Sequence, residues 1–544
     1  MSKLWRLEKP QNDVNRIPTY APGTPERTKL LQEIETLKRS TEEIPLIING
    51  EPVKTGQTVD VVCPHDHKRV LARAHLAGAA ELRQAIEAAL EAHQSWSTLD
   101  GYDRAAIFSK AADLLAGPRR IQNIAAIMTN QSKTPFEAEI DLAELVDFWR
   151  FNAYYMQFLY EQQPDQIYGE INRFDWRPLE GFILAVPPFN FYSIGGNLPT
   201  APALVGNVAL WKPARSVILS NYRIMQVLME AGMPKGVINF VPFASQHSHV
   251  VLQHPYFAGL HFTGSYETLI HLWNEIGKHL PIYRNFPRIV GETGGKDFIF
   301  VHPSADLDAV VANTIRGAFE YQGQKCSAAS RLYAPQSLWP ALRQRFLTEL
   351  PKLKVGPVDD LSVFMGAIIT QDAFDKIVSY IEEAKKNPKT YEIVYGGEYD
   401  SSTGWFVQPT VIVSCDPKST LMTEEIFGPV LTVYVYPDAE YEKTLRLCDE
   451  STNFALTGSI FAQDRQAIVQ AERLLRYAAG NFYINDKPTG AVVGRQPFGG
   501  ARHSGTNDKA GSWINLIRWL SPRTIKETLV PPKDWRRPYM GQEA

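Results

Sequence analysis

A cysteine in a polar segment is the first candidate for chemistry in this chain. Cys326 lies in the sequence Tyr-Gln-Gly-Gln-Lys-Cys-Ser, residues 321–327. A single cysteine is more often a small buried apolar residue than a nucleophile. Gly, Gln, Lys and Ser form cores poorly, however, so the segment predicts an exposed turn at the beginning or end of an element. A thiolate in such a turn can attack an electrophile, with its pKa lowered by nearby positive potential.

Two further residues could assist that attack. Glu292 lies in Val-Gly-Glu-Thr-Gly-Gly-Lys, residues 290–296, where it is either a solvated turn residue or a general base for water at a strand end. Asn190 lies in Pro-Pro-Phe-Asn-Phe, residues 187–191. It is either the first residue of an Asx turn or the donor of an amide N–H to a developing oxyanion.

The elements that must position these residues alternate between strands and helices. A helix is predicted at 79–95, where apolar residues recur at helical spacing. Apolar runs at 182–186, 208–211, 237–241 and 260–262 predict strands, and the segment after Val217 predicts a helix that ends at Gly232. Such alternation predicts a parallel sheet with helices on both faces, whose ligands bind at the carboxyl ends of the strands. The motifs above follow predicted strands, so we expect them at that edge.

Composition limits the class of protein. The chain has 544 residues, which predicts two or three domains, and it is 44% hydrophobic and 11% aromatic, as a folded protein is. Its net charge of −3 gives no basic excess for a nucleic-acid partner. The chain contains no apolar run of about 18 residues, so the sequence predicts no membrane-spanning helix. We expect no metal site.

The cysteines and the N-terminus bear on the compartment. Four cysteines without a CxxC pair are no disulfide framework and predict a reducing compartment. The first residues lack the apolar core of a secretory signal, and their acidic residues and prolines make a poor transit peptide. We expect a cytoplasmic protein, with the mitochondrial matrix as the alternative.

Seven short motifs occur in one order along the chain and together resemble the aldehyde dehydrogenase superfamily. They are PFNF (188–191), WKPA (211–214), FTGS (262–265), ETGGK (292–296), GQKCS (323–327), EEIFGP (424–429) and PFGG (497–500).

The resemblance implies an α/β fold with a Rossmann-like NAD-binding domain, an α/β catalytic domain and a small β oligomerisation flap. The expected divisions are an N-terminal arm at 1–45, the NAD-binding domain at 46–154 and 176–291, the catalytic domain at 292–510, and the flap with a C-terminal tail at 155–175 and 511–544. Members of the family exchange such a flap across a two-fold dimer, so we expect a homodimer or a higher homo-oligomer.

The resemblance also implies roles for individual residues. Cys326 matches the nucleophile, Glu292 the base that activates the hydrolytic water, and Asn190, with the backbone N–H of Cys326, the oxyanion hole. NAD is the implied cofactor. Its site would contain Lys212 at the adenosine ribose, Ser265 at the pyrophosphate and Glu425 at the nicotinamide ribose, with Pro188, Gly264 and Phe427 beside them.

The sequence departs from the family pattern in two places. FTGS is followed by Tyr266, Glu267 and Thr268, so the second glycine common in the superfamily is missing. Arg215 follows Lys212-Pro213-Ala214, where members that prefer NAD often have an acid. An arginine there can accept the 2′-phosphate of NADP, so the preference between the two cofactors stays open.

Longer strings, among them 179–191, 319–328 and 481–511, resemble the branch of the family that oxidises L-glutamate γ-semialdehyde to L-glutamate in proline catabolism. The resemblance implies that Ser327, Gly490 and Ala491 bind the substrate carboxylate and that Phe191 and Phe498 hold its aliphatic part. From the residues alone, Gly490-Ala491 is a plain turn and both phenylalanines are ordinary packing. The alternatives are another NAD(P)-dependent semialdehyde dehydrogenase, an acylating enzyme that transfers to coenzyme A, and a non-catalytic protein on the same fold.

Overall fold

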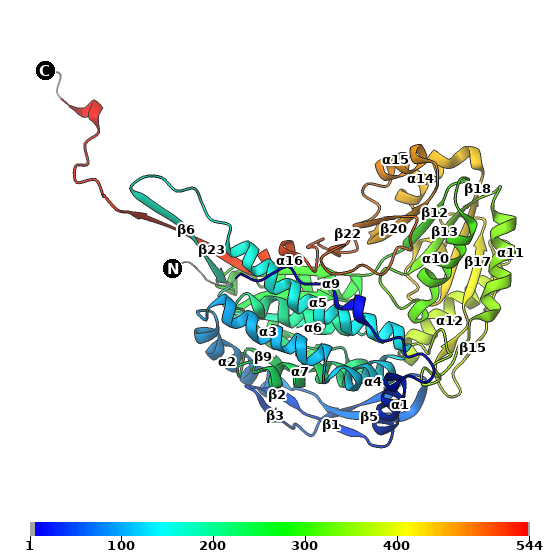
Figure 1. Ribbon diagram of the computed structural model, residues 1–544, viewed down its shortest axis with the longest axis horizontal. Helices are drawn as coiled ribbons and strands as arrows, with labels where there is room; N and C mark the ends of the chain where they lie inside the picture. The colour runs from blue at the N-terminus through cyan, green and yellow to red at the C-terminus, as the bar shows by residue number, and fades with distance from the viewer. Residues whose placement is uncertain (1–5, 542–544) are drawn as a thin grey trace.

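The computed structural model describes residues 6–541, and its chain folds into two lobes with an arm projecting from one of them (Figure 1). Each lobe contains a seven-stranded sheet in which most neighbouring strands are parallel. The predicted α/β class is confirmed. None of the helices in the described part of the chain is long and apolar enough to span a membrane.

The sheet of the first lobe is parallel over its first five strands, and two antiparallel strands extend it at one edge. Four of these strands match the apolar runs of the sequence. In order, the strands are β11 (Arg288–Glu292), β10 (Phe257–Thr263), β7 (Phe182–Val186), β8 (Val208–Trp211), β9 (Ile238–Phe240), β2 (Leu46–Ile48) and β3 (Glu51–Val53).

Helices cover this sheet, and α2 and α6 both pack against β7 and β8. The predicted helix at 79–95 is α2, and the one predicted to end at Gly232 is α7, which Gly232 terminates in a left-handed conformation. The helices of this lobe are α2 (Ala79–Trp96), α3 (Gly101–Ala116), α4 (Arg120–Gln131), α5 (Pro135–Tyr160), α6 (Tyr192–Leu204), α7 (Ile218–Ala231), α8 (Ser248–Leu252) and α9 (Tyr266–Lys278).

The second sheet has a different apolar cluster on each face. Ile299 and Val301 lie in one cluster, while Phe298 and Phe300 lie in the other, because successive side chains of a strand point to opposite faces. In order, the strands are β14 (Tyr391–Tyr395), β17 (Thr410–Ser414), β18 (Val430–Tyr436), β13 (Ala329–Pro335), β12 (Asp297–Val301), β20 (Thr457–Phe461) and β21 (Asn481–Ile484).

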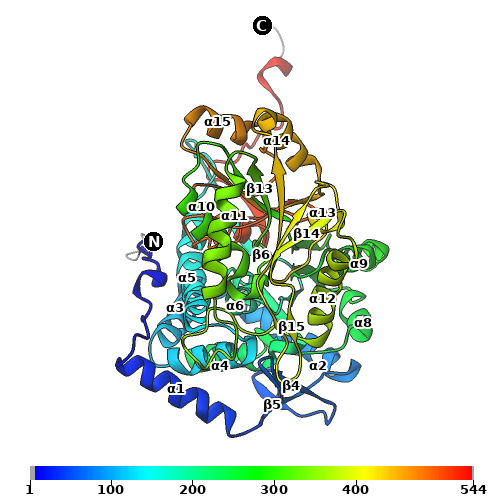
Figure 2. The same cartoon turned by 90° about the vertical axis from the view of Figure 1, so that its right-hand side faces the viewer.

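Helices lie on both faces of the second sheet. The cluster with Ile299 contains α10 (Leu307–Phe319) and α11 (Trp339–Glu349), which lie in front of β13 in Figure 2. The cluster with Phe298 contains α14 (Tyr441–Glu450) and α15 (Arg465–Leu474). The lobe also contains α12 (Gln371–Lys386), α13 (Thr420–Thr423), β15 (Tyr399–Asp400), β16 (Phe406–Val407), β19 (Phe454–Ala455) and β22 (Ala501–Arg502).

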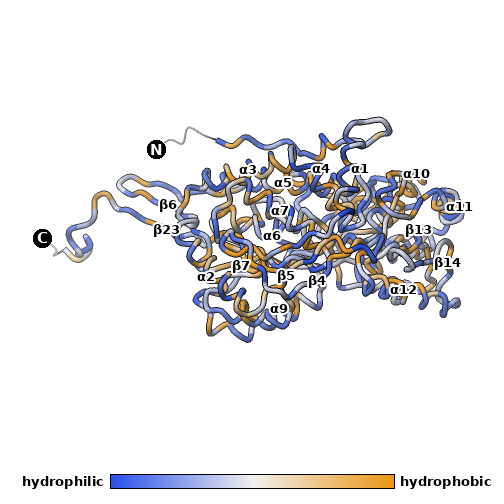
Figure 3. The backbone as a smooth tube through the Cα atoms, turned by 90° about the horizontal axis from the view of Figure 1, so that it is seen from below, coloured by the Kyte–Doolittle hydropathy of each residue, from blue (hydrophilic) through white to orange (hydrophobic). Residues whose placement is uncertain are grey.

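The projecting arm is a two-stranded antiparallel ribbon of β6 (Glu170–Pro178) and β23 (Leu520–Thr528) (Figure 1). Helix α16 (Trp513–Ile517) precedes β23. Figure 3 shows hydrophobic colouring in the strands inside the first lobe and mixed colouring along the arm. Ile167, Tyr168, Leu529 and Val530 expose apolar side chains near the end of the ribbon.

The N-terminal segment contains more regular structure than its polar composition suggested. Helix α1 (Pro25–Lys38) buries Leu30 and Ile34 and packs against α4. A separate three-stranded sheet follows, formed by β1 (Glu42–Ile44), β5 (Asp66–His75) and β4 (Thr58–Cys63). The first five residues of the expected arm and the last three of the expected tail lie outside the described residues.

Candidate functional site

The motifs of the first lobe lie at the carboxyl ends of parallel strands, as predicted. Asn190 follows β7, Lys212 follows β8, Gly264 and Ser265 follow β10, and Glu292 is the last residue of β11. Because these strands are neighbours and run in one direction, their ends meet at one edge of the sheet.

The turn that contains Cys326 is buried, and the expectation of an exposed turn was wrong. Cys326 is 7% exposed, and Gln322, Gln324 and Lys325 are buried as well. Tyr321 and Gln322 adopt left-handed backbone conformations, with φ of 52° and 56°. The Gln322 amide donates to the carbonyls of Ser132 and Ala367, at 2.9 and 2.8 Å. The Gln322 side chain of this turn is therefore hydrogen-bonded to other parts of the chain instead of to solvent.

Lys325 fixes the turn from a second side. Its ammonium lies 2.9 Å from a carboxylate oxygen of Glu137, on α5, and 3.6 Å from one of Glu320. Burial alone would lower the pKa of Lys325, but the two carboxylates raise it, so the side chain stays charged. These ion pairs at the adjacent residue restrict where the Cys326 thiol can lie.

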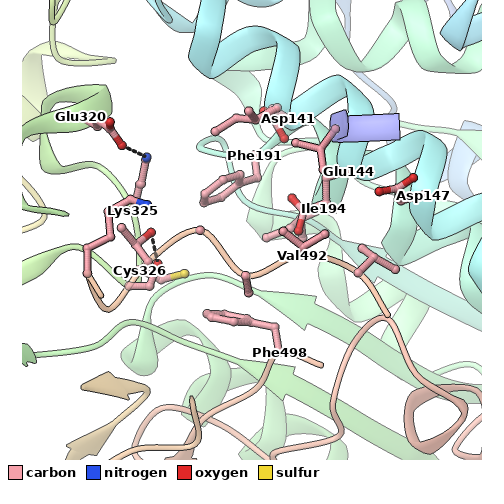
Figure 4. Close-up of a pocket in the computed structure, with 18 of the residues that line it drawn as sticks. Asp141, Glu144, Asp147, Phe191, Ile194, Glu320, Lys325, Cys326, Val492 and Phe498 are labelled. Carbon is pink, nitrogen blue, oxygen red and sulfur yellow. Dashed lines mark hydrogen bonds and ion pairs between the residues drawn. The ribbon is translucent and has the colours of Figure 1, made fainter. Parts of the chain in front are cut away.

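Two cavities meet at Cys326. The first has a volume of about 210 Å³ and is lined by Phe191, Ser327, Gly490, Ala491 and Phe498. Figure 4 shows the sulfur of Cys326 facing the space between the rings of Phe191 and Phe498. The second has a volume of about 380 Å³ and is lined by Pro188, Asn190, Lys212, Gly264, Ser265, Glu425 and Phe427. The residues assigned to substrate and those assigned to cofactor thus lie on opposite sides of one thiol.

Glu292 lines neither of these two cavities. It lines a third, smaller cavity, which shares Phe262 and Thr263 with the second cavity and Glu144, Ile194 and Phe498 with the first. Glu292 is partly exposed as a whole residue, but its Oε1 atom is buried and has no hydrogen-bond partner in the described part of the chain. Burial of this carboxyl group raises the pKa of Glu292 to about 8. Its charge still acts on Cys326: burial raises the pKa of the thiol well above its usual range, and Glu292 raises it further.

Asn190 lies where an oxyanion donor is needed. Its side chain is 3% exposed and lines the second cavity together with Cys326. One N–H of the amide donates to the carbonyl of Gln324 at 3.1 Å, two residues before the thiol. An amide has two N–H groups, so the second is left for a ligand oxygen.

The second cavity has the chemistry that a dinucleotide needs. Ser265 is the N-cap of α9 and accepts a hydrogen bond from the N–H of Thr268, so a phosphate can approach the free N–H groups of the first helical turn. Glu425 accepts a hydrogen bond of 3.0 Å from the N–H of Gly295. A Cβ on Gly294 would overlap the Glu425 carboxylate, so only glycine lets that acid reach this position. These residues fit NAD. Arg215 is exposed and does not line the cavity.

The first cavity offers donors for an anion. Ser327 Oγ donates to Thr489 Oγ1 at 2.8 Å, which joins the residue after the nucleophile to the loop of Gly490. Gly490 has a φ of +95°, a conformation that favours glycine. Among residues 6–541, no acceptor receives a hydrogen bond from the N–H of Gly490 or Ala491. Two backbone donors are therefore available at the cavity wall.

Sequence reasoning missed acids on the opposite wall. Asp141 and Glu144, both on α5, line the first cavity (Figure 4). Asp141 is paired with the buried Lys133, at 2.5 Å, whereas Glu144 accepts a hydrogen bond from Ser193 and has a pKa raised by burial to about 8. Their spacing within a mostly apolar helix was a usable signal, because acids three residues apart share one helix face.

Comparison with known proteins places these features in a family. The model of the aldehyde dehydrogenase family matches residues 52–524. A protein of Dictyostelium discoideum named "Delta-1-pyrroline-5-carboxylate dehydrogenase, mitochondrial" is 50% identical over 96% of this chain and 94% of its own length. The human protein of the same name is 48% identical over 96% of this chain and 93% of its own.

A solved structure extends the likeness to the fold. The crystal structure of the Delta-pyrroline-5-carboxylate dehydrogenase from Mycobacterium tuberculosis bound with NAD is 49% identical, covers 100% of both chains and superposes with a TM-score of 0.95. The expected family and fold are confirmed: the chain belongs to the aldehyde dehydrogenase family.

Proposed function

We propose that the chain oxidises L-glutamate γ-semialdehyde to L-glutamate with NAD, in proline catabolism. The observation that carries the proposal is the lining of the first cavity. The thiol faces two phenylalanines there, and the cavity is also lined by backbone hydrogen-bond donors and by a carboxyl group. The N–H groups of Gly490 and Ala491 suit a carboxylate, and the carboxyl group of Glu144 suits an ammonium. An α-amino acid with an aldehyde on a short aliphatic chain has these groups in this order.

Relatives support the same substrate and cofactor. The Dictyostelium, human and mycobacterial relatives are all named as pyrroline-5-carboxylate dehydrogenases, and the mycobacterial structure contains NAD. Pyrroline-5-carboxylate is the cyclic form of glutamate semialdehyde, and we expect its opening by water to need no residue of the protein.

In the acylation half of the proposed mechanism, the Cys326 thiolate attacks the aldehyde carbon. The second N–H of the Asn190 amide and the backbone N–H of Cys326 stabilise the oxyanion. Because the thiol and Glu292 both have raised pKa values, a proton must leave this pair before attack. NAD bound in the second cavity would accept the hydride. Lys212, Ser265 and Glu425 would hold it there.

In the deacylation half, Glu292 acts on water. The carboxylate takes a proton from a water molecule, the hydroxide bonds to the thioester carbon, and the carbon–sulfur bond breaks to return the thiolate. The position of Glu292 suits a base that acts only after the thioester has formed, because it lies beside both larger cavities and lines neither.

The experiment that tests the proposed function identifies the product. Purified protein is incubated with pyrroline-5-carboxylate and NAD, and NADH and L-glutamate are measured together. We expect equal amounts of both, and no requirement for coenzyme A. NADH without L-glutamate would mean that this substrate is oxidised to a different product, and the absence of both NADH and L-glutamate would overturn the proposal.

Glu144 allows a sharper test of how the amino acid is recognised. Glu144→Gln should raise KM for glutamate semialdehyde and leave KM for butanal unchanged, because butanal has no ammonium for the acid to bind. Asp147→Asn is a matched control, since Asp147 also lines the cavity but already accepts hydrogen bonds from Asn12 and from the N–H of Asp13. Equal changes with both aldehydes would contradict the role of Glu144.

We also propose that the chain forms a homodimer or a higher homo-oligomer through the β6–β23 arm. The apolar residues near the end of the arm are exposed together, as at a protein–protein interface, and a second copy would cover them. Sedimentation should show a dimer or larger species; a monomer would contradict this.

The protein works, we propose, in a reducing compartment, the cytoplasm or the mitochondrial matrix. All four cysteines are free, and the proposed nucleophile must stay reduced. The Dictyostelium and human relatives are named mitochondrial, which favours the second of these compartments.

A further inference from the structure

The third cavity reaches Glu292 from the side of residues 506–510, and Cys326, which lines both larger cavities, does not line it. The centre of a water molecule can lie anywhere within a volume of about 50 Å³ in this cavity. Each water needs roughly 10–15 Å³ of that volume. The cavity therefore has room for a few waters. Asn507, which is exposed, lines the cavity at the protein surface, so the waters can exchange with solvent.

Residues 506–510 form one wall of this cavity, and hydrogen bonds from Ser504 and Thr506 fix the segment to the strand that carries Glu292. Thr293 donates its N–H to the carbonyl of Ser504 at 3.0 Å. Thr506 donates its N–H to the carbonyl of Gly291 at 2.9 Å, and its hydroxyl accepts from the N–H of Gly291 at 3.0 Å. These bonds lie on both sides of Glu292, so residues that follow in the segment have fixed positions relative to its carboxyl group.

Lys509 is the cation on that wall. Its ammonium donates to the carbonyls of Gly480 and Gly499, at 2.8 and 3.0 Å, and to the side-chain oxygen of Asn481 at 3.3 Å. All three N–H groups of an ammonium are then used, and all three acceptors are neutral. Within residues 6–541, no carboxylate lies within ion-pair distance of Lys509. Its charge is fixed in place and uncompensated.

Among the titratable groups around Glu292, Lys509 is the main charge that acts on its carboxyl group. Burial lowers the pKa of His261 to about 4, so the imidazole is neutral near pH 7. Burial raises the pKa of Glu144 to about 8 and that of the Cys326 thiol well above its usual range, so neither adds a full negative charge near pH 7, and a substrate ammonium would offset the charge of Glu144. Asp508 is bound to Arg518, at 3.2 Å, and to Thr506. Burial raises the pKa of Glu292, and Lys509 opposes that shift.

We propose that Lys509 is a positioning residue whose fixed charge keeps Glu292 available as an ionised base, and that Glu292 returns its proton to solvent through the third cavity. The inference rests on the proposed function, because it needs Glu292 to be the base of hydrolysis. The proton taken from the hydrolytic water passes from the Glu292 carboxyl group to a water of this cavity and then to solvent. This can happen while the two larger cavities remain filled.

The test compares the pH dependence of kcat in three proteins. Lys509→Gln keeps a donor for the backbone carbonyls but removes the charge, and Lys509→Arg keeps the charge. Removing the charge should move the rising limb of kcat to higher pH by about one unit, so that kcat near neutral pH falls about tenfold and recovers in alkali. The limb of Lys509→Arg should stay at the pH of the wild type.

A purely structural role gives a different result. Gly499 adjoins Phe498, so loss of the lysine could disturb the substrate cavity, which would raise KM and leave the pH of the limb unchanged. An unchanged limb in Lys509→Gln, or an equal shift in Lys509→Arg, overturns the proposal. If the wild type itself makes no NADH from glutamate semialdehyde, the proposed function fails instead.

Infrared spectroscopy of the wild type tests the passage without any change at Lys509. The carbonyl band of protonated Glu292 is assigned by its loss in Glu292→Gln. With NAD and glutamate both bound, a pH jump across about 8 should make this band appear and disappear reversibly. A band that responds only in the free protein would show that the proton leaves through one of the larger cavities, and would overturn the proposed passage.

Discussion

The hydroxyl of Ser327 donates to the hydroxyl of Thr489 across 2.8 Å, and both side chains are buried. This contact joins the residue next to the nucleophile to the loop that presents the N–H groups of Gly490 and Ala491. The group that would react and the groups that would hold the substrate therefore share one rigid connection. A change in the loop should be felt in substrate binding and not in cofactor binding.

Gly490→Leu should raise KM for glutamate semialdehyde and weaken inhibition by L-glutamate, while the Kd for NAD is unchanged. The left-handed φ of Gly490 disfavours any side chain, so the loop must shift and its donors move away from the carboxylate. Losing one or more donors costs roughly 1–3 kcal/mol each, which corresponds to about a tenfold to hundredfold weaker binding.

Gly232→Leu is the matched control. Gly232 has a φ of +97°, close to that of Gly490, but it ends α7 at an exposed position with open space around it. This change should lower the unfolding temperature and leave both KM values unaltered. If Gly490→Leu, like the control, lowered the unfolding temperature but left KM for glutamate semialdehyde unchanged, the loop would have no role in binding the substrate.

Cys326→Ala should abolish NADH formation and leave the Kd for NAD unchanged, because the thiol forms the bond to the substrate and is not needed to hold the cofactor. Cys415 is exposed and lines none of the three cavities, so it supplies the control: Cys415→Ala should keep full activity. Substantial turnover by Cys326→Ala would show that Cys326 is not the nucleophile.

Glu292→Gln should give one rapid burst of NADH followed by slow turnover, since the amide cannot accept a proton from water. In the wild type, the same acid makes kcat rise with pH. The carboxylate is the active form, and burial raises the pKa of Glu292 to about 8, so activity is gained as the pH increases through about 8. Steady-state turnover equal to that of the wild type, or a kcat independent of pH, would show that Glu292 is not the base.

Cofactor preference should favour NAD over NADP in kcat/KM, even though Arg215 is next to the Lys212 segment. Arg215 does not line the second cavity, although its charge acts on Lys212 and lowers the pKa of that lysine further after burial. Arg215→Ala should therefore leave the NAD reaction nearly unchanged. A wild-type preference for NADP, lost in Arg215→Ala, would mean that the arginine binds the 2′-phosphate.

Local sequence predicted the elements that carry the motifs, for physical reasons visible in single segments. The apolar run 182–186 became β7, and Gly232 ends α7 because it alone in its segment adopts a left-handed φ without strain. Helix α1 went unnamed because only Leu30 and Ile34 of its residues are buried, which is too sparse a pattern to separate a helix from a polar arm.

Tertiary partners decided what local sequence could not. Gln322 and Lys325 indicated an exposed turn, yet their bonds to Ser132, Ala367 and Glu137 lie far away in sequence and allow the turn to be buried. Glu144 was overlooked because an acid on a helix is usually on a solvated face. Likewise, no local pattern shows that Glu292 lines a third cavity, since the residues around it come from distant segments, among them 144–148, 194–198, 261–263 and 506–510.

Substrate choice is the central claim, and one ratio tests it most directly. If Ser327, Gly490 and Ala491 hold the α-carboxylate, an aldehyde without that group leaves several donors unpaired, at a cost of roughly 1–3 kcal/mol for each one. The measurement is kcat/KM of the wild type for glutamate semialdehyde and for butanal, with NAD at saturation. We predict a ratio on the order of a hundredfold or more in favour of glutamate semialdehyde. Equal values for the two aldehydes would contradict the account and leave only the family and its thiol chemistry standing.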